Sequence, residues 1–203
     1  DGRLQITRNG GESWVDVTPR NLKGAQINAI DVSPHEPGVA YIAVAGYKMN
    51  DFRPHVYKVT QYGKRWRKID SDLPPDNFVR VVRADPEREG LLYAGTEGGL
   101  FVSFDDGDHW QSLNMNFPTV PITDLRVRQG TLIAATQGRG FWALDELTVI
   151  RQLDDALSDK PLHVYTPKPT SLMRWGSWAG ANEGANPPSG VVISYVITDD
   201  AEG

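Results

Sequence analysis

The sequence predicts an all-β protein assembled from a repeated unit of several strands. Residues 7–14 (the first box) and 103–110 (the second box) share the pattern S/T-x-D/N-x-G-x-x-W, of which residues 59–66 (the worn box) keep Gly63 and Trp66. The tryptophans that end these segments lie 52 and 44 residues apart, a spacing typical of the blades of a β-propeller. Twenty glycines and fourteen prolines supply the many turns of such a fold. The predicted architecture is therefore part of a β-propeller.

Each box has the composition of a hairpin turn. Asp, Asn, Ser and Thr side chains accept hydrogen bonds from backbone N–H groups a residue or two ahead, and glycine takes a positive φ at no steric cost. The tryptophan then buries its ring against neighbouring strands. This pattern is the Asp-box, and we expect structural roles for its residues: Thr7, Asn9, Gly11, Trp14, Gly63, Trp66, Ser103, Asp105, Gly107 and Trp110.

Two chemical roles compete with this interpretation in the second box. Asp105 is a candidate catalytic carboxylate, but its role in the turn already accounts for it. The cluster of Asp105, Asp106 and Asp108 suggests calcium, yet it lacks the alternating spacing and the final bidentate glutamate of an EF-hand loop. The turn is favoured, and no metal site is predicted.

The strands follow one order in every repeat. An apolar strand ends in a turn, a second strand follows, and a third strand enters the box. The predicted segments are residues 27–34, 39–45 and 55–59 in one unit, 79–86, 91–96 and 98–103 in the next, and 122–127, 130–136 and 140–144 in the last. In the last unit Asp145-Glu146-Leu147 replaces the box. With residues 1–19 as the tail of an earlier blade, this makes about four partial or whole blades.

The domain boundaries follow from where the repeat stops. Residues 1–150 are predicted to be propeller blades, residues 151–186 a linker, and residues 187–203 the start of a C-terminal β-sandwich, with its first strand at residues 191–197. The chain opens inside a strand without an initiator methionine, so we expect it to be a piece of a longer protein whose remaining blades complete the ring.

Composition narrows the function classes. The formal net charge is −5 with no basic cluster, which argues against nucleic acid as a partner. There is no cysteine, and no apolar run approaches the roughly 20 residues of a membrane-spanning helix. The four histidines lie in separate segments without metal-site spacing, and neither a G-x-S-x-G elbow nor a phosphate loop is present. No cofactor is predicted.

Three segments together resemble a known family. They are Gly99–Trp110, which contains the second box, Gln137–Asp145 with the sequence QGRGFWALD, and Asn186–Ile193 with the sequence NPPSGVVI. They resemble the exported bacterial proteins with Asp-box (BNR) repeats and a sortilin-like propeller, many of which are labelled glycosyl hydrolases. Gln137 departs from the histidine usual in that family. The resemblance implies an extracellular, periplasmic or cell-envelope location and ligands held by loops at a propeller face.

The functional prediction is a non-catalytic module of a large exported protein that binds a protein, a peptide or a carbohydrate. The alternative is a glycoside hydrolase similar to xyloglucanases, with this segment holding only part of the site. Glycoside hydrolysis needs two carboxyls about 5–9.5 Å apart, and no local motif singles out such a pair. A sialidase-like site would use Arg126, Arg128 and Arg139 with Tyr93, but alternation places the first two on one face, as in a solvated strand. Whether the parent protein is an enzyme stays open.

Arg139 and Trp142 are the candidate ligand-binding residues. A guanidinium between two glycines and beside aromatic rings suits a carboxylate, a sugar or a peptide. The alternative is a blade-closing turn in which Arg139 pairs with an acid such as Asp145. Trp175 and Trp178 pose a similar choice between a binding surface and packing of the linker.

Overall fold

The computed structural model describes residues 2–22, 24–153, 161–170 and 190–197. Two compact units make up the chain, Asp1–Asp145 and Glu146–Gly203. The predicted tryptophan pair Trp175 and Trp178 lies outside the described residues. The two units are considered separately below.

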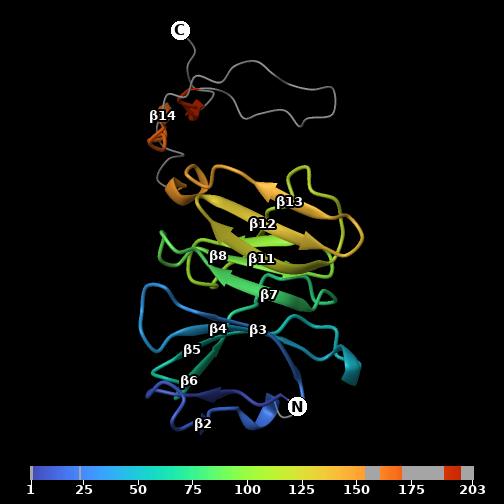
Figure 1. The fold of residues 1–203 in the computed structure, drawn as a ribbon. Coiled ribbons are helices and arrows are strands. Elements are labelled where there is room, and N and C mark those ends of the chain that lie inside the picture. The colour runs from blue at the N-terminus through green and yellow to red at the C-terminus, as the bar shows by residue number, and fades with distance from the viewer. Residues whose placement is uncertain (1, 23, 154–160, 171–189, 198–203) are drawn as a thin grey trace. The chain divides into compact units, whose positions relative to one another are not determined.

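The first unit consists of antiparallel sheets in which strands pair in chain order (Figure 1). A two-stranded sheet comes first, then two sheets of four strands and one of three. The strands are β1 (Gln5–Ile6) and β2 (Val15–Asp16); β3 (Gln26–Val32), β4 (Ala40–Ala45), β5 (Val56–Thr60) and β6 (Arg65–Lys68); β7 (Val79–Ala84), β8 (Leu92–Thr96), β9 (Leu100–Ser103) and β10 (Gln111–Ser112); β11 (Ile122–Arg128), β12 (Thr131–Thr136) and β13 (Phe141–Leu144). Two short 3-10 helices, η1 (Arg20–Leu22) and η2 (Tyr47–Met49), lie in connections.

Successive sheets pack face to face, with the first strand of each next to the first strand of the following one. Strand β3 contacts β7, and β7 contacts β11, so these strands form the inner edge of the blade array. Each carries a bulge at the same place, between Ile27 and Ala29 in β3, Val79 and Val81 in β7, and Ile122 and Asp124 in β11. A bulge bends a strand and strengthens its twist, as stacked twisted blades require.

Apolar side chains fill the spaces between sheets. One cluster joins the β3–β6 sheet to the β7–β10 sheet and includes Val56, Ile69, Val79, Phe101 and Trp110. Another packs residues 4–25 against the β3–β6 sheet. The sheets approach so closely at Gly95 that a Cβ added there would lie 2.6 Å from Ile122 Cγ2. The all-β, partial-propeller prediction is confirmed.

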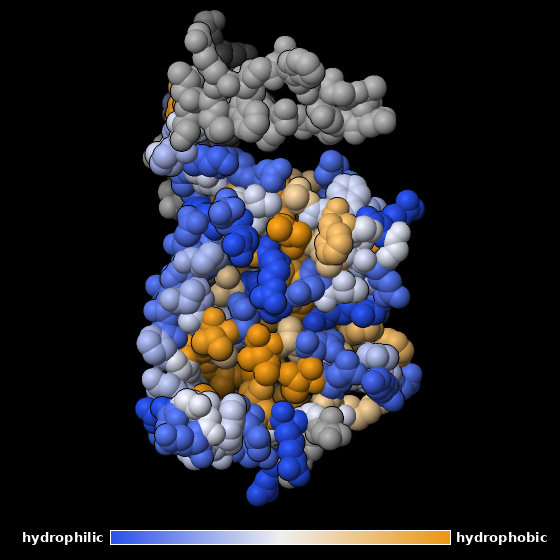
Figure 2. All heavy atoms as spheres, in the orientation of Figure 1, coloured by the Kyte–Doolittle hydropathy of each residue, from blue (hydrophilic) through white to orange (hydrophobic). Residues whose placement is uncertain are grey.

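Both outer faces of the array leave apolar side chains exposed. On the last sheet Phe141 is 82% exposed, and Ile133 is exposed beside it. On β3, Ile30 and Val32 are exposed, and hydrophobic residues are visible over this region of the surface in Figure 2. Strands β1 and β2 correspond to the third and fourth strands of a blade, so the β3 residues lack the covering that two inner strands would give.

The second unit contains one small sheet. Strand β14 (Leu162–Val164) pairs with β15 (Tyr195–Ile197), and the 3-10 helix η3 (Ile150–Gln152) precedes them. Leu147 and Tyr165 are buried. The C-terminal strand is shorter than the predicted residues 191–197. Its partner β14 falls within residues 162–166, which the sequence also predicts as a strand inside the linker. A continuous apolar run indicates a buried strand, but Val191, Val192 and Ile193 are exposed and unpaired here.

Candidate functional site

The second box forms a hydrogen-bonded turn between β9 and β10. The Gly107 N–H donates to Ser103 Oγ (2.8 Å), and the Ser103 hydroxyl donates to Asp105 Oδ1 (2.9 Å). The same carboxylate accepts the His109 N–H and contacts His109 Nδ1 at 2.6 Å. Burial raises the pKa of Asp105, but the hydrogen bonds from His109 and Ser103 outweigh it and lower the pKa.

The first box repeats these bonds on the surface. The Gly11 N–H donates to Thr7 Oγ1 (2.9 Å), and the Ser13 N–H donates to Asn9 Oδ1 (3.0 Å). Trp14 is nevertheless 57% exposed, whereas Trp110 is 6% exposed. The Trp110 indole donates to the Ile69 carbonyl of the preceding sheet (2.6 Å). Trp14 has no such sheet before it among the described residues.

The worn box keeps the turn with different side chains. Gln61 and Tyr62 take positive φ (53° and 56°), and Gly63 follows at φ 90°. A Cβ on Gly63 would lie 2.5 Å from Val17 Cγ1, so glycine is required for close packing on the preceding sheet. The Trp66 indole donates to the Gly63 carbonyl (3.2 Å).

Arg139 and Trp142 lie together at the β12–β13 turn. The Trp142 indole donates to the Arg139 carbonyl (3.1 Å), and the Arg139 N–H donates to Thr136 Oγ1 (3.1 Å). The Arg139 side chain is exposed and forms no ion pair within the described ranges. The alternative pairing with Asp145 is absent, because Asp145 follows the opposite end of β13 and accepts a hydrogen bond from Thr131 Oγ1 (3.1 Å).

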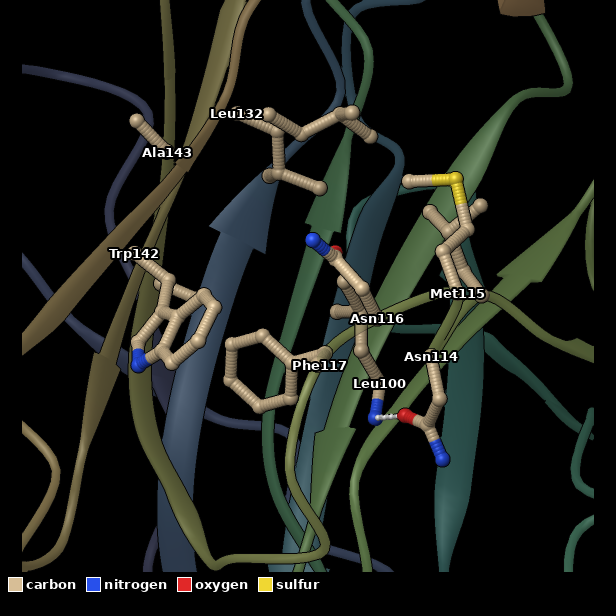
Figure 3. A pocket seen from close by; sticks show the side chains of 11 residues that line it. Leu100, Asn114, Met115, Asn116, Phe117, Leu132, Trp142 and Ala143 are labelled. Atoms are coloured by element: carbon tan, nitrogen blue, oxygen red, sulfur yellow. Dashed lines mark hydrogen bonds between the residues drawn. The ribbon is translucent and has the colours of Figure 1, made fainter.

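A small cleft of about 50 Å³ opens beside Trp142, between β13 and the connection from β10 to β11 (Figure 3). The Phe117 ring meets the Trp142 ring edge-on, with centroids 5.1 Å apart. Leu132 and Met115 also line the cleft, which is therefore mainly apolar. Asn114 is already engaged, because its Oδ1 accepts the Leu100 N–H (2.8 Å).

The position of Trp142 is aromatic in all three larger sheets. Tyr57 is second in β5, Phe101 second in β9 and Trp142 second in β13. Tyr57 and Phe101 are buried at 8% and 9% exposure in sheets that have a fourth strand, whereas Trp142 is half-buried in the sheet that has three. The cleft therefore lies where a fourth strand would cover the last sheet.

Three charged side chains on the inner strands lie together, a grouping that the sequence analysis did not predict. Arg83 of β7 donates to Asp124 Oδ1 of β11 (2.7 Å) and to the Leu125 carbonyl (2.9 Å), and Asp31 of β3 lies 3.9 Å away. Burial raises the pKa of Asp31, while the Ala84 N–H and Arg83 act in the opposite direction. Aligning the inner strands on their bulges places Asp31 and Arg83 at equivalent positions, a signal that could have pointed to their contact.

The long β4–β5 connection, residues 46–55, was also missed. Its counterparts after β8 and β12 have three and four residues. Tyr47 stacks on Phe78 with centroids 5.0 Å apart, and Met49 and Phe52 are exposed. Asp51 holds the loop through Arg53 (2.8 Å) and His55 (3.1 Å), and the Arg53 hydrogen bonds chiefly lower the pKa of Asp51. Comparing connection lengths between repeats would have found this loop.

The other candidate catalytic and metal-binding residues do not come together in one site. His109 is exposed, as expected of a turn residue, and Tyr93 is buried with its hydroxyl donating to Asp85 (3.1 Å). That burial keeps Tyr93 from acting as a sialidase-like nucleophile. Within the described ranges no three His, Asp or Glu side chains gather as a metal site.

Among the described residues, no helix has the length and hydrophobicity needed to cross a bilayer.

Comparison with known proteins gives one sequence relative. The chain is 26% identical over 108 residues to an oligoxyloglucan-reducing end-specific xyloglucanase of Emericella nidulans. The matched segment covers 52% of this chain and 13% of that enzyme. No protein-family model matches.

Two solved structures share the fold. A GH74 xyloglucanase from Xanthomonas campestris matches 70% of this chain with a TM-score of 0.54 and 21% identity, and the match covers 24% of that enzyme. YCF48 bound to D1 peptide matches 70% of this chain with a TM-score of 0.52 and 22% identity, over 45% of that protein. The chain spans less than half of each relative. It is thus a partial all-β propeller whose fold is shared by xyloglucanases and YCF48.

Proposed function

We propose that this chain is a non-catalytic binding module, part of the propeller of a larger exported protein. The observation that carries the proposal is the cleft beside Trp142, where a half-buried indole and the exposed, unpaired Arg139 lie at one turn. An aromatic face and a free guanidinium are groups that recognise peptides and carbohydrates.

The relatives support a polymeric ligand. YCF48 has been solved with a peptide, and the fungal and bacterial relatives act on xyloglucan. An extracellular or cell-envelope location accords with a ligand of either kind. On this chain the ligand contacts are Arg139 and Trp142, and the boxes serve the fold.

Charge pairing supports binding over hydrolysis. A glycosidase needs a protonated carboxyl of raised pKa on one side of the scissile bond. Of the carboxylates on the connections that share a face with the Arg139 turn, Asp51 is held by Arg53 with a lowered pKa, and Glu97 pairs with Arg80. Asp51, with its lowered pKa, is suited to orienting neighbouring cations rather than to donating a proton.

A glycoside hydrolase is the second candidate, and the xyloglucanase relative favours it. In that case this segment contributes only part of the active site, since it matches a small share of the enzyme.

The deciding experiment uses the full-length protein with xyloglucan oligosaccharides and a panel of acidic and apolar peptides, measuring both binding and release of reducing sugar. We expect binding without release, weakened about tenfold by Arg139→Ala or Trp142→Ala. Release of reducing sugar that disappears when one pair of carboxylates is substituted would instead establish the hydrolase.

A further inference from the structure

The fourth strand of the β3–β6 sheet carries a local concentration of positive charge. Residues 64–68 read KRWRK, so four of five side chains are basic in a chain whose formal net charge is −5. This run corrects the expectation that the chain has no basic cluster. It covers the end of the worn box and the whole of β6, which lies at the outer edge of its sheet.

The cross-strand register gathers three cations on one side of this sheet. Arg67 lies opposite Lys58, and Arg65 lies opposite Thr60. Residues two apart in a strand point to the same side, and residues directly opposite each other share a face. The three basic side chains therefore project together, with the Thr60 hydroxyl among them. A groove of about 440 Å³ is lined by Lys58, Thr60, Arg65, Trp66 and Arg67.

Arg65 is the cation of this groove that has no partner. Lys58 donates to Asp106 Oδ2 (2.5 Å). Arg67 pairs with the same carboxylate (3.3 Å) and with Asp108. The Arg65 side chain is exposed and forms neither an ion pair nor a hydrogen bond within the described residues. Its guanidinium donors are therefore free to bind a ligand.

The fold of a blade does not require basic residues at these positions. The other two boxes form the same turn and the same pairing of third and fourth strands. Aligned on the box tryptophans, the corresponding residues of those sheets include neither arginine nor lysine. They are Ile6 and Val102 for Lys58, Ser13 and His109 for Arg65, and Val15 and Gln111 for Arg67. Blade folding thus leaves the cations of the groove unexplained.

The charges around the groove favour an anion that is attached to hydroxyl groups. Arg65 offers a planar fork that binds a carboxylate or a sulfate through two hydrogen bonds. Asp108, which pairs with Arg67, is 57% exposed, and its carboxylate accepts hydroxyl hydrogen bonds but repels a second anion. A sugar acid presents an anion and hydroxyl donors together. A nucleic acid repeats a phosphate in every unit, which the net charge of −5 opposes.

The shape of the groove suits a chain rather than a small molecule. Every residue that lines it is at least partly exposed. Sites for small molecules enclose most of the ligand surface, which an open groove at the outer edge of a sheet does not do. A polymer can instead lie across the groove and place one unit at a time against the cations.

We propose that this groove binds an acidic polysaccharide, with Arg65 holding a carboxylate or a sulfate of one sugar unit. Lys58 and Arg67 add positive potential, and Thr60 hydrogen-bonds to sugar hydroxyls. The box turns join third and fourth strands, whereas Arg139 lies between a second and a third strand, so the two sites lie at different ends of the strands. The inference therefore adds a site to the proposed function and does not depend on Arg139.

The test uses the full-length protein and a fluorescein-labelled oligogalacturonate, with its methyl ester as the matched uncharged ligand. We expect fluorescence anisotropy to rise with the acid and not with the ester. A sulfated oligosaccharide of the same length shows whether sulfate serves as well as carboxylate. Binding should weaken severalfold when the ionic strength rises from about 0.01 M to about 0.15 M, because the Debye length falls from about 30 Å to about 8 Å.

Substitutions of Arg65 separate charge from geometry. Arg65→Ala should weaken binding about tenfold, as for the loss of one charge-assisted hydrogen bond. Arg65→Lys keeps the charge without the planar fork and should give an intermediate affinity. Both variants should keep the Tm of the natural protein, because the Arg65 side chain has no partner within the described residues. Arg20→Ala removes an exposed arginine outside the groove and should leave binding unchanged.

Four results would overturn the proposal. They are equal affinity for the acid and its methyl ester, unchanged affinity of Arg65→Ala, tighter binding of a single-stranded oligonucleotide or of a polyglutamate peptide, and protection of Arg65 from phenylglyoxal in the free protein. The last result would show that another segment of the full-length protein covers the groove.

Failure of this inference can be told apart from failure of the proposed function. If xyloglucan oligosaccharides bind and Trp142→Ala weakens them while the oligogalacturonate does not bind, the inference is wrong and the proposed function stands. If the oligogalacturonate binds through Arg65 while no ligand depends on Arg139 or Trp142, the inference stands and the site beside Trp142 is wrong.

Discussion

At the scale of single residues, the second box offers a buried hydroxyl whose loss is measurable. Ser103 is buried and its Oγ accepts the Gly107 N–H. Ser103→Ala leaves that N–H without a partner inside the fold, so we expect the free energy of unfolding to fall by about 1–3 kcal/mol. Urea denaturation followed by tryptophan fluorescence measures it.

Thr7→Ala is the matched control for Ser103→Ala. Thr7 makes the same bond to the Gly11 N–H, but the first box is exposed, so water replaces the hydroxyl. Its unfolding midpoint should move little. Equal losses in the two variants would contradict the dependence on burial.

The His109 and Asp105 pair gives stability a pH dependence of known sign. The hydrogen bond that the His109 ring donates to Asp105 raises the pKa of His109 above its ordinary 6.5. The stabilising contribution is therefore complete below about pH 6.5 and is lost as pH rises through the higher folded-state pKa. Asp105, whose pKa is lowered, contributes stability that is complete above its ordinary pKa of 3.8 and is lost as pH falls through the lower folded-state pKa.

His109→Gln should remove the alkaline part of this dependence. We expect the difference in Tm between pH 6 and pH 8 to shrink in the variant relative to the natural protein. Because His109 is exposed, the change is small and is best measured at low ionic strength, where surface pairs are least screened. An unchanged difference in Tm would show that the pair does not contribute.

At the scale of elements, packing as well as backbone conformation should determine how much stability is lost when a glycine in a turn is replaced by alanine. Gly107 has φ 88°, and a Cβ there would lie 2.7 Å from Ile69 Cδ1 of the preceding sheet. Gly138 has a similar φ of 92° but nothing within 4 Å of such a Cβ. Both alanine variants incur the left-handed conformation, about 1–2 kcal/mol.

Gly107→Ala should therefore lower stability more than Gly138→Ala, by about 1–3 kcal/mol for the overpacking of Ile69. The comparison is made on unfolding midpoints in urea. If the two variants lose the same stability, the close approach of the turn to the preceding sheet carries no energetic weight.

Prediction from sequence succeeded where local chemistry decides the structure. Strands in the repeats are short runs rich in apolar residues, and glycine and proline mark their ends, so the all-β class and the order of strands were readable. Residues 191–197 were expected as one strand, but only Tyr195–Ile197 pairs. Partner strands determine where pairing stops, and no local pattern records them.

The candidate site was readable only in part. Arg139 and Trp142 are neighbours in sequence and could be named together. Phe117 meets Trp142 only because two sheets pack, and no local sequence pattern records that contact.

At the scale of the whole molecule, the open faces of the first unit predict self-association of the isolated chain. Phe141 projects from the last sheet and is 82% exposed. Uncovered sheet faces and edges are sites of association. We expect species larger than the monomer in sedimentation velocity, decreasing when Phe141→Lys places a charge on that face.

Phe52→Lys is the control for this prediction. Phe52 is also exposed, but it lies in the β4–β5 connection rather than on a sheet face. It should leave association unchanged. A sample that sediments as a monomer and melts in one sharp transition would contradict the prediction.

The box turns make their contacts with the preceding sheet. Asp106, in the turn of the β7–β10 sheet, accepts hydrogen bonds from Tyr41 (2.6 Å) and Lys58 (2.5 Å) of the sheet before it. In the worn box Tyr62 likewise packs under the Arg8 guanidinium, 4.0 Å from its ring centroid. Each of these turns therefore contacts the sheet that precedes it in the chain.

The last sheet ends in Asp145 instead of a box, and no later box turn among the described residues fastens it. Under mechanical load or limited proteolysis of the isolated chain, the sheets should therefore come apart in order, from β13 toward β3. The order in which the sheets unfold is thus set by which neighbouring sheet each turn contacts.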